Sequence, residues 1–157
     1  MGLKEEYEKR KQRREAVQYF RSNNSAFLSP KQYTIVIISI LLISLLGGFI
    51  QAAITSGTGI RFGIVYLLDA YLIAMVAKKV SSYVNGKVRM ICYIGYVIAI
   101  LTTPIFMIGI QIGLPIIPAL LLQPEAWLMA IQSILQPNIL GWISYLIGAY
   151  ELSMLLK

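Results

Sequence analysis

The stretch from Gln32 to Ile60 contains no charged residue, and this feature constrains the fold more than any other. It is longer than the roughly 20 residues with which an α-helix crosses the hydrocarbon core of a bilayer. Only 13% of the 157 residues are charged, whereas a soluble domain carries about a quarter. The sequence therefore predicts an all-α protein, a polytopic transmembrane helical bundle.

Four apolar segments are the predicted spans, at about residues 33–54, 62–77, 90–113 and 139–156. The second is short and is interrupted by Asp69, so its assignment depends on the clear spans on either side. Residues 1–31 are predicted to be a basic, amphipathic cytoplasmic tail, and residues 32–157 the transmembrane domain. The domain is too small to contain two membrane units.

The segment from Leu114 to Pro137 is rich in proline and has a single charge, at Glu125. Proline and an acid both suit the first turn of a helix, which predicts a helix from about Ala126 to Gln136. Such a helix is too short to span, so we expect a re-entrant or interfacial helix on the outer side. A fifth crossing from Ile116 to Ile134 is the alternative, with prolines and Glu125 at its centre.

Basic residues decide the predicted orientation. With four spans, thirteen of the 14 basic residues share one side, and only Arg61 lies on the other. Such a bias marks the cytoplasmic side, so both termini are predicted to be cytoplasmic. Basic groups there attract anionic lipid headgroups, and this distribution argues against nucleic acid as the partner. The residues expected to contact headgroups are Arg13, Arg14, Arg21, Lys78, Lys79, Lys87 and Arg89.

Asp69 is the strongest candidate for a functional residue. It lies near the middle of a predicted span, where a carboxylate costs at least ~2.5 kcal/mol and no basic residue is at a comparable depth. It could bind a proton or a cation, or it could be a neutral acid that hydrogen bonds to Tyr66, one turn earlier, and holds helices together. Glu151, the second intramembrane acid, is predicted near the inner interface at a different depth.

Small residues recur at helical spacing on three of the predicted spans. Such positions let helices approach closely, and they indicate packing before they indicate function. The positions are Ser44 and Gly48, Gly95 and Ala99, and Gly141, Ser144 and Gly148, the last three continuing to Glu151.

The sequence offers no constellation that would indicate an enzyme. The chain has no histidine and one cysteine, Cys92, and it has neither a phosphate-binding glycine loop nor a nucleophile elbow. No metal site or cofactor is expected.

The stretch from Tyr66 to Leu101, with its basic loop carrying Asn85-Gly86-Lys87, and the ending LIGAYELSMLLK resemble small multi-span bacterial inner-membrane proteins of unknown function. The likeness covers about half of the chain, and Asp69 or Ala70 stands where those proteins often have glycine. It implies a four-helix architecture and a bacterial source.

Two functional hypotheses follow. The first is an accessory, scaffold or interaction protein of a bacterial cytoplasmic membrane. The partners expected besides lipids are a larger membrane protein complex or further copies of the chain. The second is a small oligomeric transporter or channel in which Asp69 couples protons or cations.

Overall fold

The computed structural model describes residues 7–8, 11–13, 15–16, 28–59, 63–81, 84–136 and 139–157. Within these ranges the chain forms helices and no strand, which confirms the all-α fold class. The elements are α2 (Pro30–Thr58), α3 (Gly63–Val80), α4 (Gly86–Ile112), the 3₁₀ helix η1 (Leu114–Ile116), α5 (Ile117–Leu122), α6 (Pro124–Leu135) and α7 (Ile139–Leu155).

Capping residues start α2 and α4 a few positions before the apolar runs begin. Ser29 caps α2: its hydroxyl accepts from Gln32 N at 3.3 Å, and Gln32 Oε1 accepts from Ser29 N at 2.7 Å. Asn85 caps α4, because its Oδ1 accepts from Val88 N at 2.9 Å. Such bonds satisfy amide groups that have no partner inside the helix, so the helices extend beyond the ranges that hydropathy predicts.

Four basic residues between the second and third predicted spans, Lys78, Lys79, Lys87 and Arg89, are helical. Lys78 and Lys79 belong to the last turn of α3, where cations favour the negative end of the helix dipole. Lys87 and Arg89 belong to the first turn of α4. Both pairs are therefore held at fixed places on one end of the bundle.

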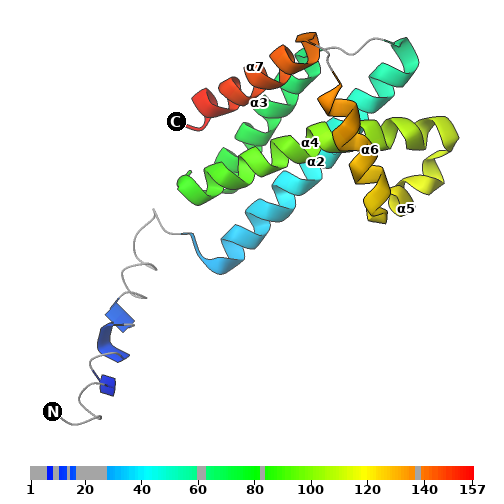
Figure 1. Ribbon diagram of the computed structural model, residues 1–157. Coiled ribbons are helices and arrows are strands. Elements are labelled where there is room, and N and C mark those ends of the chain that lie inside the picture. The colour runs from blue at the N-terminus through cyan, green and yellow to red at the C-terminus, as the bar shows by residue number, and fades with distance from the viewer. Residues whose placement is uncertain are drawn as a thin grey trace.

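Helices α2 and α4 lie side by side along much of their length and run in the same direction (Figure 1). Gly95 packs against Ile40 and Ser44, and Gly48 packs against Ala99 further along both helices. Contacts that advance together along two helices define a parallel pair. Helices α3 and α7 are also parallel, because Gly63 contacts Ser144 and Tyr66, further along α3, contacts Gly148, further along α7.

The bundle core is apolar over most of its length. It is built from one face of each of the four long helices, and its fully buried members include Val36, Ile40, Ile73, Val88, Cys92 and Leu152. The outward faces of the same helices expose large apolar side chains, among them Ile35, Leu42, Leu46, Leu68, Val97 and Leu146. Large apolar residues therefore occupy both the inside and the outside of the bundle.

The segment from Leu114 to Leu135 folds as two helical pieces joined at a bend of 94°. As predicted, α6 opens on proline with Glu125 in its first turn. It packs back on α4 through a small cluster of Ile105, Ala126 and Ala130, and Trp127 Nε1 donates to Leu121 O at 2.9 Å. This return carries the chain to the start of α7 (Figure 1).

Among the described residues, α2 and α4 are long and apolar enough to cross a membrane. The bent pair Leu114–Leu122 and Pro124–Leu135 would provide a third crossing if it forms one broken span. The structure thus supports two or three candidate spans by length and composition, fewer than the four predicted from sequence. The shorter α3 and α7, of 18 and 17 residues, do not meet the same criteria.

Candidate functional site

Asp69 lies on the face of α3 that packs into the bundle. Only 5% of its surface is exposed, and its Oδ2 is buried without a hydrogen-bond partner among the described residues. A buried polar atom without a partner costs about 1–3 kcal/mol, more if it is charged, so such atoms are rare in native proteins. The position of Asp69 is therefore energetically costly for the fold, and this is the main reason to regard it as functional.

Gly47 on α2 makes room for the Asp69 carboxylate. A Cβ atom added at Gly47 would overlap Asp69 Oδ1 and Cγ. Sequence analysis did not single out this glycine, although the adjacent glycines at 47 and 48 are a visible signal. The two neighbours serve different interfaces: Gly47 faces α3, and Gly48 faces Ala99 and Thr102 on α4.

The ring of Tyr66, the suggested hydrogen-bond partner of Asp69, packs against α7. Its ring makes an edge-to-face contact with Tyr145 of α7, with centroids 4.9 Å apart and planes at 84°. No hydrogen bond reaches Asp69 Oδ2 from Tyr66 or from any other described residue. Among the described residues, Tyr66 therefore makes no hydrogen bond to Asp69 Oδ2.

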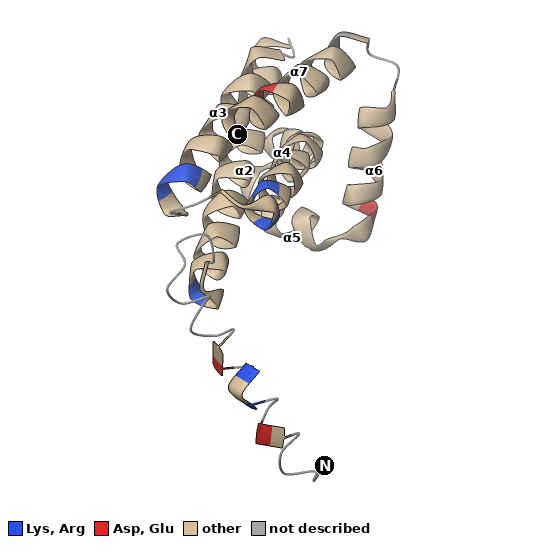
Figure 2. Ribbon diagram, turned by 90° about the vertical axis from the view of Figure 1, so that its left-hand side faces the viewer, with Lys and Arg blue, Asp and Glu red and all other residues tan. Residues whose placement is uncertain are grey.

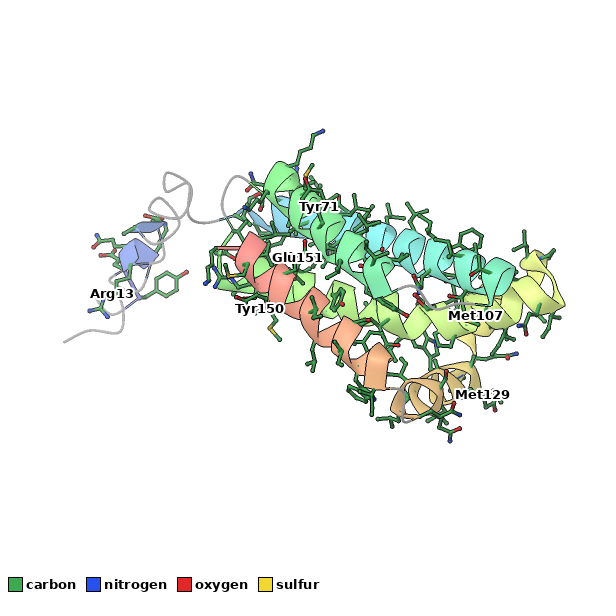
Figure 3. All side chains as sticks on the ribbon, turned by 90° about the horizontal axis from the view of Figure 1, so that it is seen from above. Arg13, Tyr71, Met107, Met129, Tyr150 and Glu151 are labelled. Carbon is green, nitrogen blue, oxygen red and sulfur yellow. The ribbon has the colours of Figure 1, made fainter. Side chains whose placement is uncertain are left out.

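Glu151 lies much closer in depth to Asp69 than the sequence suggested. The parallel helices α3 and α7 are in contact at Gly63 with Ser144 and at Tyr66 with Gly148. Counting on along both helices from these contacts brings Asp69 level with Tyr150 and Glu151. Figure 3 shows Glu151 at the junction of α7 with α3, whereas Tyr150 lies on the outer side. The expected difference in depth of a turn or more is therefore wrong, because sequence spacing carries no information on the relative register of two helices.

Tyr96 of α4 packs against α7. Its hydroxyl occupies the space left by Gly148, since a Cβ added there would overlap it, and it donates to Tyr145 O at 3.2 Å. The buried Tyr96 hydroxyl thus joins α4 to α7.

The small residues predicted to pack do lie at helix–helix contacts. Ser44 and Gly48 of α2 face Gly95 and Ala99 of α4, so the two pairs meet each other. Ser44 Oγ itself donates to Ile40 O at 2.7 Å and needs no partner across the interface. On α7, Ser144 packs on α3, Gly148 packs on Tyr96, and Gly141 is half-buried near the helix start.

Further polar side chains are buried between α2 and α4. Thr102 Oγ1 and Thr103 Oγ1 each donate to Ala99 O, at 3.2 and 2.9 Å. This bonding to the preceding turn satisfies a hydroxyl locally. Thr55, two turns along α2 from Gly47 and Gly48, has a buried Oγ1 without a partner among the described residues. Polar groups therefore occur in the bundle on the side of Asp69 remote from the basic end.

The described basic residues of the bundle gather at one end (Figure 2). Lys78, Lys79, Lys87 and Arg89 are exposed there, and Arg89 Nη2 also donates to Leu156 O at 3.0 Å, which joins the start of α4 to the end of α7. Arg13 in the tail is exposed. Arg14 and Arg21, also predicted to contact headgroups, lie outside the described residues.

No group of three or more His, Cys, Asp and Glu residues that could hold a metal ion occurs in the described part of the chain. Comparison with known protein families, with curated proteins and with solved structures finds no match for this chain. The candidate site therefore rests on geometry alone: Asp69 packs against Gly47, and Glu151 lies near the same axial level.

Proposed function

We propose that this chain is a four-span membrane protein that acts as an accessory or interaction protein of a bacterial cytoplasmic membrane. The observation that supports it best is the pairing of an apolar exterior with a basic end. Side chains such as Ile38, Leu42 and Val97 are about half exposed, which would be costly in water at ~25 cal/mol per Å². In a bilayer these side chains contact lipid instead of water, and anionic headgroups attract the basic end of the bundle.

Helices α3 and α7 are the two additional crossings in this proposal. At 1.5 Å per residue their 18 and 17 residues reach about 27 and 26 Å, slightly short of the roughly 30 Å hydrocarbon core. Lysines at the ends of both helices, Lys78, Lys79 and Lys157, extend to the interface and accommodate a small mismatch. Contact with α2 and α4 shields the polar Asp69 from lipid.

Cysteine labelling in intact cells tests the topology. In a Cys92→Ala background, a cysteine at Gly57, near the far end of α2, is expected to react with a membrane-impermeant maleimide. A cysteine at Lys87, at the basic end, is expected to react only after the membrane is permeabilised. Gly57 suits this use because nothing lies within 4 Å of an added Cβ. Equal labelling of both positions in intact cells would contradict the proposed arrangement.

Purification in a mild detergent tests the accessory role. We expect a larger membrane protein to co-purify in a fixed stoichiometry and to remain bound through size-exclusion chromatography. The projecting α6, which exposes Leu128, Met129 and Leu135, is available as a contact surface. Recovery of the chain alone as a defined homo-oligomer would count against this role and in favour of the second candidate.

The second candidate is a small oligomeric transporter or channel with Asp69 as its proton- or cation-coupling acid. It is supported by one specific observation, the buried Oδ2 of Asp69 without a described partner. An acid inside a membrane domain, with no ion-pair partner, is a functional-site hypothesis by default. In this role the other described helices supply the packing that isolates the carboxyl from lipid.

A further inference from the structure

A segment of α3 recurs in α7, 79 positions later in the chain. Residues 66–78 and 145–157 align without a gap and are identical at six of 13 positions. The identical pairs are Tyr66 and Tyr145, Leu67 and Leu146, Ala70 and Ala149, Tyr71 and Tyr150, Met75 and Met154, and Lys78 and Lys157. Helices α3 and α7 therefore carry the same sequence pattern toward their C-terminal ends.

The two segments are also equivalent in the structure. Helices α3 and α7 run in parallel, and the aligned residues Tyr66 and Tyr145 contact each other, with ring centroids 4.9 Å apart. Burial follows the same alignment, since Ile73 and its counterpart Leu152 are both buried. Parallel helices that touch through equivalent residues are related by an approximate two-fold axis between them. Their exposed faces therefore point to opposite sides of the pair.

Each segment carries a row of exposed side chains that ends at the basic end of the bundle. The positions are spaced i, i+3, i+7 and i+10, which places them on one side of a helix. We name the rows the α3 stripe, which is Leu68, Tyr71, Met75 and Lys78, and the α7 stripe, which is Ile147, Tyr150, Met154 and Lys157; all eight residues are exposed. Figure 3 shows Tyr71 and Tyr150 on opposite sides of the helix pair.

The recurrence of the stripes is informative because their residues are exposed. Packing inside the bundle constrains buried positions, whereas an outward position in a membrane helix only has to be apolar. That requirement does not select tyrosine, methionine and lysine at the same three places on two helices. A ligand bound in the same way on both faces does select them.

We infer that each stripe binds one anionic phospholipid, with the headgroup at the lysine and an acyl chain along the apolar side chains. The inference rests on the proposed function, which places the basic end of the bundle at the cytoplasmic leaflet. It adds the location of the lipid sites, the residues that form them and a stoichiometry of two lipids per chain.

The charge at the end of each stripe suits an anionic headgroup. Lys79 follows Lys78 in the last turn of α3. Near Lys157, the Arg89 guanidinium is held at the end of α7, because its Nη2 donates to Leu156 O at 3.0 Å. Each stripe thus ends at two basic side chains, and charged donors of this kind form strong hydrogen bonds to phosphate oxygens.

The length and surface of the stripes suit an acyl chain. Ten residues separate the first and last member of each stripe, which is about 15 Å along a helix. One leaflet contributes the same depth, half of the roughly 30 Å hydrocarbon core. In the α7 stripe, Lys157 Nζ lies 3.5 Å from Met154 Sδ, so the lysine side chain extends along the apolar part of its own stripe.

Native mass spectrometry of the full chain in detergent, titrated with phosphatidylglycerol, counts the lipids that remain bound. We expect two per chain, and we expect phosphatidylcholine with the same acyl chains to bind at least about fivefold more weakly. Lys78→Gln and Lys157→Gln should each weaken one site by about fivefold, the effect of one lysine near an anionic lipid surface. The double variant should weaken both sites.

Lys31→Gln is the matched control for charge. Lys31 is exposed in the first turn of α2, at the same end of the bundle, and belongs to neither stripe, so this variant should retain both lipids. For the apolar part, Tyr71→Ala and Tyr150→Ala should each weaken one site, whereas Leu42→Ala on the exposed face of α2 should weaken neither. Circular dichroism checks that every variant remains helical.

Equal binding of the two lipids, or an equal loss of lipid in Lys31→Gln and Lys78→Gln, would overturn the inference. A polypeptide that remains bound in place of lipid and is released by Lys78→Gln would also overturn it. Cysteine labelling at Gly57 and Lys87 separates this result from the proposed function. If the labelling agrees with the proposed topology, failure of the lipid experiment concerns the stripes alone, whereas equal labelling of both positions would overturn the topology together with the lipid sites.

Discussion

Gly47→Ala is expected to lower the stability of the purified protein by about 1–3 kcal/mol, the usual effect of overpacking a well-packed interior. The added Cβ would overlap the Asp69 carboxylate, so either α2 and α3 move apart or Asp69 leaves its position. Both changes disrupt the contact that encloses the acid. Thermal unfolding in detergent, followed by circular dichroism, measures the change.

Gly57→Ala is the matched control. It is the same substitution on the same helix, but nothing lies within 4 Å of the added Cβ and the position is exposed. Alanine is favoured over glycine inside helices by up to ~1 kcal/mol, so this variant should be as stable as the original or slightly more so. Equal changes in stability for Gly47→Ala and Gly57→Ala would show that the Asp69 carboxylate does not pack against α2.

A double substitution identifies which group causes the effect of Gly47→Ala. Asp69→Ala removes the atoms that the new Cβ would overlap, so Gly47→Ala should cost much less in that background. Residues in direct contact commonly show coupling energies of about 0.5–3 kcal/mol in such cycles. Additive effects would place the steric conflict elsewhere on α2.

Under the second candidate function, Asp69→Asn is expected to preserve the fold and to abolish proton-dependent transport. The amide has nearly the shape of the carboxyl group, and Oδ2 makes no hydrogen bond among the described residues that the change could break. Stability should therefore change by less than about 1 kcal/mol, the net contribution of a typical hydrogen bond. Asparagine cannot bind and release a proton. Proton flux into proteoliposomes that contain the full chain should therefore fall to the level of empty liposomes.

The matched control for this substitution is Glu125→Gln, at the exposed start of α6. It removes a carboxylate of the same kind without touching the bundle interior, and it should leave both flux and folding intact. If Asp69→Asn instead unfolds the protein while flux through the remaining folded fraction is normal, Asp69 has a packing role. That outcome would favour the accessory function.

Several local features followed directly from sequence. The proline and acid at positions 124 and 125 predicted the start of α6, and the long apolar runs predicted α2 and α4. Small residues predicted faces that come into contact, because glycine and serine at helical spacing fall on one side of a helix. Helix boundaries were less accurate, since Ser29 and Asn85 set them by capping and not by hydropathy.

The main residue of the candidate site could be predicted from the sequence, but the residues around it could not. Asp69 stood out because a carboxylate in an apolar segment is costly, which is a property of one position. Gly47 and Tyr96 became visible only through their contacts with residues far away in sequence. The contact of the Tyr66 ring with Tyr145 of α7 could likewise not be predicted, because helical spacing within α3 does not indicate which helix covers it.

The sequence by itself determined that this chain is helical, that its long helices are apolar enough for lipid, and that the described basic residues of the bundle lie at helix ends. These properties depend on residue type and local spacing. Only the tertiary structure decided that α7 packs against α3 and that Glu151 lies near the axial level of Asp69. The physical reason is that helical periodicity fixes which face of a helix is buried, but not which helix covers that face or at what axial register. That register is set here by side-chain packing at Gly63, Ser144 and Gly148.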